Sequence, residues 1–197
     1  MIHFDMDCEP ANDIVVLRIL DNDTLSSKQG GFVIGDEVLR NLRIGLYQIL
    51  KIGKDAKENT GLDVGAYVFA DKLASFYHTA PICLMRYNAL VMETNLERTK
   101  YRALGGRCIV QEFSLGESES GGFVIPTSDE LRIGVIKSIT PPYEGKDNAS
   151  EFKVGDKILL TKDERDALYG FKGDKDLDPS KPIYIYKTDA IIAKVND

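Results

Sequence analysis

The sequence contains no tryptophan, two histidines and three cysteines among its 197 residues. His3 and His78 have no neighbouring Cys, Asp or Glu at metal-ligand spacing, so we expect neither a metal site nor a bound cofactor. Cys8, Cys83 and Cys108 are odd in number and form no Cys-x-x-Cys pair. This pattern indicates reduced thiols in the cytoplasm rather than a disulfide framework or a zinc site.

Long apolar runs and an excess of basic charge are also missing. No run of about 18 apolar residues could form a transmembrane helix, and the first residues lack the basic and apolar regions of a secretory signal. The chain has 25 basic and 31 acidic residues, a formal net charge of −6, and no basic cluster. We therefore expect a soluble, cytoplasmic protein that binds neither membranes nor nucleic acids.

Enzymatic motifs are likewise absent. The sequence has no glycine-rich phosphate loop that opens a helix, no Gly-x-Ser-x-Gly and no His-Glu-x-x-His. The acidic pairs at 21–23 and 117–119 lie among Gly, Ser, Lys or Asn, which favours solvated loop charge over catalysis. Residues 174–178 resemble a calcium loop only faintly, because the required Gly and terminal Glu are missing. We therefore expect a protein that is not an enzyme.

What the sequence does contain is an internal repeat. Gly-Gly-Phe-Val-Ile occurs at residues 30–34 and again at 121–125, an offset of 91 residues. Other blocks recur in the same order, which predicts a duplicated domain with units at 1–98 and 99–197. These further blocks are Leu-Arg-Ile-Gly at 42–45 and 131–134, an apolar segment with Val-Gly at 62–69 and 152–159, and an apolar segment at 87–91 and 188–192.

Each half is predicted to be all-β. The apolar runs are short, rich in Val, Ile, Leu, Phe and Tyr, and separated by Gly, Asp, Asn and Pro, and no helical period persists over three turns. Segments 36–42 and 162–168 are the candidates for a short helix. With about 90 residues in each half, we expect two small β-barrels in tandem, because closure removes exposed sheet edges.

The repeated segments resemble a known family. In each half a Gly- and Ser-containing stretch leads to Phe-Val-Ile and returns at Arg-Ile-Gly, within segments 24–42 and 116–131. This arrangement is similar to the mobile loop of GroES-type co-chaperonins. The Val-Gly pairs at 64–65 and 154–155 and the closing segments at 88–91 and 189–192 extend the resemblance, so the chain resembles two GroES-like barrels in tandem.

The resemblance implies a partner and a binding site. The family docks its loop on the apical domain of a GroEL-type chaperonin ring, which binds the ATP, and its members form homo-oligomeric rings. Burial of each apolar side chain contributes about 1.5–3 kcal/mol, and each ordered residue costs about 1–2 kcal/mol, so single contacts are weak and several together are strong. The implied chaperonin-binding residues are Gly30, Gly31, Phe32, Val33, Ile34, Gly121, Gly122, Phe123, Val124 and Ile125.

The sequence also departs from the family. Residues 54–63 are shorter than the hairpin that roofs the family's dome, whereas 140–153 are longer and contain Pro141-Pro142. An open or shallow dome follows, as in the divergent co-chaperonins of some bacteriophages, which would act in the host cytoplasm. The family's ring has seven positions, and chains that each supply two domains cannot fill an odd number of positions.

Other interpretations stay open on the sequence alone. Phe32–Ile34 and Phe123–Ile125 would also fit ordinary barrel strands that follow Gly-Gly turns. The chain would then be a structural or assembly component, for example of a phage particle. An enzyme such as the barrel part of a dehydrogenase fits least, because no nucleotide-binding βαβ unit is present. Arg43 and Arg132 fit surface positions as well as functional ones.

Overall fold

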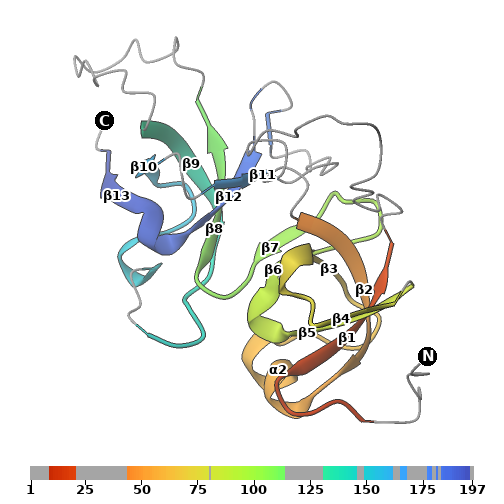
Figure 1. Cartoon of the computed structure of the whole chain (residues 1–197). Helices are drawn as coiled ribbons and strands as arrows, with labels where there is room; N and C mark the ends of the chain where they lie inside the picture. The colour runs from red at the N-terminus through yellow and green to blue at the C-terminus, as the bar shows by residue number, and fades with distance from the viewer. Residues whose placement is uncertain are drawn as a thin grey trace, which may run out of the picture.

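Two antiparallel sheets make up the protein (Figure 1). The computed structural model describes residues 9–20, 44–79, 81–113, 131–145, 149–161, 165–167, 177–178, 181 and 183–195. Within these residues the chain is mostly strand, as expected for an all-β protein, and none of the helices has the length and hydropathy needed to cross a bilayer.

The first sheet, sheet A, has the strand order β4-β5-β1-β2-β3-β6-β7. Its strands contain the short apolar runs that the sequence predicts, and the alternate side chains of each run form the core. In chain order, the elements are β1 (Ile14–Ile19), β2 (Ile44–Ile52), α2 (Lys54–Thr60), β3 (Tyr67–Asp71), η1 (Lys72–Ala74), β4 (Tyr77–Thr79), β5 (Ile82–Arg86), η2 (Tyr87–Ala89), β6 (Leu90–Thr94) and β7 (Tyr101–Ala103).

The second sheet, sheet B, has the order β11-β12-β8-β9-β10-β13. When the strands of each half are matched in chain order, this is the order of the first six strands of sheet A. The elements are β8 (Arg107–Glu112), β9 (Leu131–Ile139), η3 (Ala149–Glu151), β10 (Lys157–Thr161), β11 (Arg165–Ala167), β12 (Ile183–Lys187), η5 (Thr188–Ala190) and β13 (Ile191–Lys194).

The two sheets also share their irregularities. The β1–β2 ladder has a register shift between Val16 and Leu17, and the β8–β9 ladder has one between Ile109 and Val110. The β3–β6 and β10–β13 ladders have a second pair of matching shifts. Gly65 and Gly155 have φ angles of 92° and 94°, a region that favours glycine, at the same turn of each half. The correspondence therefore reaches single residues, but it corrects one block of the sequence repeat. The strand registers match Leu46 with Ile133, so the Ile-Gly pairs at 44–45 and 133–134 are two residues out of step.

Neither sheet closes into a barrel within the described residues, so the expectation of closed barrels was wrong. Sheet A ends at β4 and β7, and sheet B ends at β11 and β13. In sheet A, β4 pairs with the outer edge of β5, and β7 pairs with the outer edge of β6. These two pairings take the place of a pairing that would close the sheet. The edge of β13 carries no further strand in the described part of the chain.

The short helices differ from the sequence expectation. Of the candidate segment 162–168, residues Arg165–Ala167 form strand β11, because they pair with Tyr184–Tyr186 of β12. The other candidate, 36–42, lies outside the described residues. Among the described residues an α-helix forms instead at α2, which ends at Gly61 with φ 66°, and the Gly61 N–H donates to the carbonyl of Lys57 at 2.8 Å.

A tight turn at residues 95–100 joins β6 to β7 within sheet A, so sheet A continues past the predicted boundary at residue 98 and the chain passes to sheet B only after Ala103. The amide oxygen of Asn95 accepts hydrogen bonds from the backbone N–H groups of Thr99 and Lys100, at 2.8 and 3.0 Å. The Thr94 hydroxyl donates to the Lys100 carbonyl at 2.7 Å. β7 therefore folds back on β6 of sheet A before the chain enters β8 of sheet B.

Each sheet encloses its own apolar core, and a third core lies between the sheets. Residues such as Leu17 and Val68 fill sheet A, and residues such as Val110 and Ile158 fill sheet B. The third core joins Ile109 and Ile185 of sheet B to the opposite face of sheet A. The sheet A members of this core are Ile44, Leu46, Phe69, Val91, Met92 and Ala103, with Leu20 and Tyr101 at its margin.

Candidate functional site

The two segments predicted to bind a partner are connections between neighbouring antiparallel strands. In the first half, the Leu20 N–H donates to the Leu46 carbonyl at 3.1 Å, on either side of residues 21–43. In the second half, the Phe113 N–H donates to the Ile133 carbonyl at 2.9 Å, on either side of residues 114–130. Each connection therefore starts and ends at adjacent points on a sheet.

The predicted binding residues themselves lie outside the described part of the chain. This applies to all ten positions, Gly30–Ile34 and Gly121–Ile125. The structure describes the base of each connection. We define the base as the residues that directly precede the connection and the first residues of the strand that follows it. The two bases differ in chemistry.

The base of the first connection is apolar. Ile44 and Leu46 at the start of β2 are buried, and Leu20 packs beside them. Ile109 and Ile185 of sheet B cover this patch. The first connection therefore leaves the fold at the junction of the two sheets.

The base of the second connection holds a buried polar cluster. Glu112 is the last residue of β8, and its carboxylate accepts a hydrogen bond from the Tyr186 hydroxyl. The Arg132 Nε lies 3.9 Å from the other carboxylate oxygen of Glu112. The side chains of Arg132 and Glu112 are only 12% and 5% exposed. Arg132 is therefore not a surface residue, and it joins the two strands from which the connection leaves, whereas Arg43 lies outside the described residues.

Neighbouring side chains extend this base. The Gln111 amide donates to the Asp178 carbonyl at 2.7 Å and accepts from the Asp178 N–H at 3.3 Å. Lys157 and Lys181 place their ammonium groups 5.6 and 4.9 Å from the centre of the Phe113 ring. Such contacts are typical of cation–π pairs. Glu112, Gln111 and Tyr186 had no signal in the sequence, because the hydrogen bonds from Gln111 to Asp178 and from Tyr186 to Glu112 join residues 67 and 74 positions apart.

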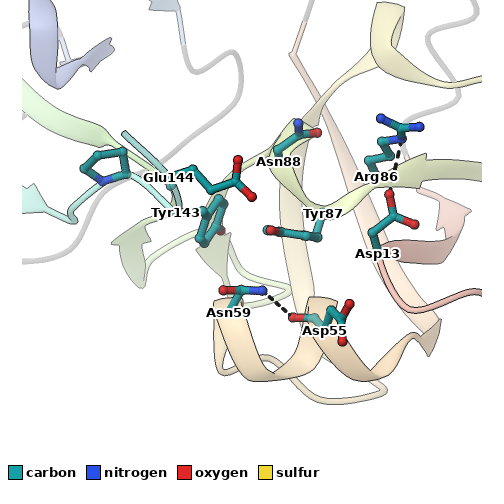
Figure 2. Close-up of a pocket in the computed structure, with 10 residues that line it drawn as sticks. Asp13, Asp55, Asn59, Arg86, Tyr87, Asn88, Tyr143 and Glu144 are labelled. Atoms are coloured by element: carbon teal, nitrogen blue, oxygen red, sulfur yellow. Dashed lines mark hydrogen bonds and ion pairs between the residues drawn. The ribbon is translucent and has the colours of Figure 1, made fainter. Parts of the chain in front are cut away.

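A polar cavity of about 560 Å³ lies between sheet A, α2 and the segment after β9 (Figure 2). The rings of Tyr87 and Tyr143 meet edge to face there, with centroids 4.8 Å apart. Arg86 pairs with Asp13 at 3.3 Å on one side. Burial raises the pKa of Tyr143 to about 12, and its hydroxyl has no hydrogen-bond partner among the described residues.

This cavity offers carboxylates, amides, phenols and a guanidinium, but neither a serine or cysteine nor a histidine. The residues that line it are Asp13, Asp55, Asn59, Arg86, Tyr87, Asn88, Gly105, Pro142, Tyr143 and Glu144. The described lining therefore lacks the Ser–His or Cys–His pair of a serine or cysteine hydrolase. The described residues also contain no group of three His, Cys, Asp or Glu side chains that could hold a metal ion.

The structure describes two of the three cysteines, and both have buried thiols of low reactivity. Cys83 in β5 and Cys108 in β8 are fully buried and free. Burial raises the pKa of each thiol to about 12, although a hydrogen bond with Ser75 opposes the shift at Cys83. They belong to separate cores, so a disulfide between them is not formed.

Residues 100–195 match the family model of the chaperonin 10 Kd subunit. This match covers β7 to β13, just under half of the chain, and it supports a co-chaperonin-type role. The first half has no such match. No curated protein matches the chain significantly. The described fold is consistent with the match. The strands within residues 100–195 all belong to sheet B, except β7, which belongs to sheet A.

Proposed function

We propose that this protein is a co-chaperonin with two GroES-like units in tandem, which caps a GroEL-type chaperonin ring in the cytoplasm. The observation that carries the proposal is the family match over residues 100–195. The equal strand order of the two sheets supports a second unit in the first half, where the family model finds no match. In this proposal the ATP is bound by the chaperonin.

The docking elements in this proposal are Phe32–Ile34 and Phe123–Ile125. Each lies in a long connection whose two ends are held side by side by a strand pair, so a connection can reach a partner while its base stays fixed. Several such weak contacts on one ring would multiply the overall affinity through effective concentration. They would also release together when the partner changes shape.

The test uses the full chain with a GroEL-type chaperonin and ATP. We expect the protein to change the ATPase rate of the chaperonin and to raise the refolding yield of a denatured client. Replacement of all six residues of the two tripeptides by Ser should abolish both effects. A matched control replaces Leu73 and Phe76 by Ser, since these side chains are 73% and 59% exposed and lie outside both connections.

Two results would overturn this function. One is an inactive wild-type protein, and the other is unchanged activity after both tripeptides are replaced. Limited proteolysis gives a second measurement. We expect chaperonin and nucleotide together to suppress cleavage within residues 21–43 and 114–130. Equal cleavage with and without the chaperonin would favour a structural or assembly component instead.

A further inference from the structure

The polar cavity between sheet A, α2 and the segment after β9 is built by both halves of the chain (Figure 2). Asp55 and Asn59 come from α2, and Tyr87 comes from η2, all in the first half. Tyr143 and Glu144 come from the segment after β9, in the second half. The cavity therefore requires two units in one chain, and it lies outside both of the proposed docking segments.

The junction between the halves holds one wall of this cavity in place. A Cβ atom at Gly105 would collide with the Tyr143 ring, so the ring lies directly against the backbone there. At Gly106, a Cβ atom would lie 3.0 Å from the Cβ of Pro142. The Tyr87 ring contacts the Tyr143 ring edge to face. Backbone packing and a ring contact thus fix the aromatic wall before any ligand enters, which lowers the cost of binding.

The charges that line the cavity do not balance. Three carboxylates and one guanidinium are present, and they belong to Asp13, Asp55, Glu144 and Arg86. Arg86 pairs with Asp13 at 3.3 Å. Within the described part of the chain, neither Asp55 nor Glu144 forms an ion pair. A cation that enters between these two carboxylates is attracted by both of them.

Two further arginines lie near the cavity without reversing this balance. Burial raises the pKa of Tyr143, and the charges of Arg107 and Arg102 oppose this shift, so both guanidinium groups are close. Arg102 pairs with Glu93 at 2.6 Å, and Arg107 donates to four backbone carbonyls. Neither lines the cavity. Even with Arg107 counted, the lining carboxylates outnumber the guanidinium groups by three to two.

We propose that this cavity binds an organic cation, an ammonium or a guanidinium group, between the carboxylates of Asp55 and Glu144. Such a cation donates charge-assisted hydrogen bonds to carboxylates. The Asn59 amide nitrogen donates to the Asp55 carbonyl at 2.8 Å, so the amide oxygen is the Asn59 atom that accepts from the cation. The rings of Tyr87 and Tyr143 add the attraction between a cation and the electron-rich face of an aromatic ring.

The volume and the donor set favour an organic cation over other occupants. The described residues contain no group of three His, Cys, Asp or Glu side chains that could hold a metal ion. A neutral polar molecule would leave both carboxylates without a counter-charge. The volume of about 560 Å³ is within the range of small-molecule sites. The cation is therefore either a free diamine-like molecule or a basic side chain of a bound polypeptide, and the two share their chemistry.

Isothermal titration calorimetry of the full chain with agmatine, without chaperonin, tests the proposal. Agmatine carries a guanidinium and an ammonium group, and butanediol is an uncharged counterpart. We expect one agmatine to bind each chain and butanediol not to bind. Asp55→Asn and Glu144→Gln should each weaken the binding at least about fivefold, because each removes one charge and keeps the shape. Added sodium chloride should weaken it as well.

Matched controls separate this site from the general attraction of cations to an acidic chain. Glu58→Gln removes another carboxylate of α2, and Glu151→Gln removes one of η3. Both side chains are exposed, and neither lines the cavity, so both variants should bind agmatine like the wild type. Tyr143→Phe should also keep the binding because the ring remains, whereas Tyr143→Leu should weaken it. Circular dichroism and urea denaturation must show that each variant is folded.

A Gly-Arg-Gly peptide, acetylated and amidated at its ends, distinguishes the two sources of the cation. Tighter binding of the peptide than of agmatine assigns the site to a basic side chain, and the reverse assigns it to a free cation. Three results would overturn the proposal. These are no binding of either probe, equal binding of butanediol, and a loss of binding in Glu58→Gln as large as that in Glu144→Gln.

This inference does not rest on the proposed function. The tripeptide-to-Ser variants keep the cavity, so they should bind agmatine like the wild type. Agmatine binding without any effect on a chaperonin would refute the proposed function and leave the cation site standing. An effect on a chaperonin without agmatine binding would refute the cation site alone.

Discussion

The hydroxyl of Tyr186 donates a hydrogen bond to the carboxylate of Glu112, and both side chains are buried. The bond links β12 to the last residue of β8, where the second long connection begins. Arg132, at the start of β9, approaches the same carboxylate. Three strands are therefore tied together at the base of the predicted docking segment.

Tyr186→Phe should lower the free energy of unfolding by about 1–3 kcal/mol, because it leaves the buried Glu112 carboxylate with one partner fewer. Urea denaturation followed by circular dichroism measures the change. Tyr67→Phe, at a half-buried tyrosine of β3, is the control and should cost less. Equal losses in the two variants would contradict a special role for the Tyr186–Glu112 bond.

Acid should selectively remove the contribution of Asp156. The Lys194 ammonium donates to its carboxylate at 2.7 Å, and this bond holds the pKa of Asp156 below its ordinary value of 3.8. A lowered pKa in the folded state stabilises the protein above the unfolded pKa, and the stabilisation is lost as the pH falls through the folded value. The wild type and Asp156→Asn should therefore differ most near neutral pH and converge in acid.

Urea denaturation at a series of pH values from neutral to acid tests this prediction. Asp63→Asn is the control, since the Asp63 side chain is 73% exposed although it pairs with Lys57. Exposed pairs contribute little, so this variant should follow the wild type at every pH. A constant difference between the wild type and Asp156→Asn across the series would show that the Asp156 charge is not responsible.

Part of this fold follows from the sequence and part does not. Short alternating apolar runs predict strands, and the recurrence of Val-Gly predicts that Gly65 and Gly155 are equivalent, which the structure shows as turns with φ angles of 92° and 94°. Local patterns failed for β11, where pairing with β12 overrides a helical tendency. They also failed for α2, whose Gly61 end is a recognisable stop signal. Both errors concern segments of three to seven residues, which are too short for a reliable period.

The candidate site shows the same division. The two long connections were predictable from the order of the repeated blocks, but their exact ends were not, because the Ile-Gly pairs at 44–45 and 133–134 are two residues out of step in the strand registers. The cluster of Glu112, Arg132 and Tyr186 was not, because its contacts depend on which strands become neighbours.

The buried thiols should be unreactive in the folded protein. A pKa of about 12 for Cys83 and Cys108 leaves almost no thiolate at neutral pH, and burial blocks access as well. In a Cys8→Ser background, we expect no alkylation by iodoacetamide at pH 7.5 and complete alkylation in urea. Peptide mass spectrometry assigns each site. Rapid modification of either thiol in the native protein would contradict the buried positions.

Replacement of Arg107 by lysine should destabilise the junction between sheet A and sheet B. Its guanidinium donates to the carbonyls of Leu90, Leu104 and Gly105 at 3.2–3.4 Å, and also to that of Asn88 at 3.4 Å. These bonds join β8 of sheet B to the end of sheet A. A lysine ammonium cannot match the planar group of donors, so Arg107→Lys should destabilise the protein by about 1.5–3 kcal/mol.

The Arg107 prediction has a matched control in Arg18→Lys, at an exposed arginine of β1. That variant should stay within about 0.5 kcal/mol of the wild type in urea denaturation. Because the Arg107 bonds cross from one half of the chain to the other, Arg107→Lys should also increase hydrogen exchange at β7. The amide of Leu104, which bonds to Val91, is the position to follow. Unchanged exchange at Leu104 together with unchanged stability would show that the junction is held by its apolar core alone.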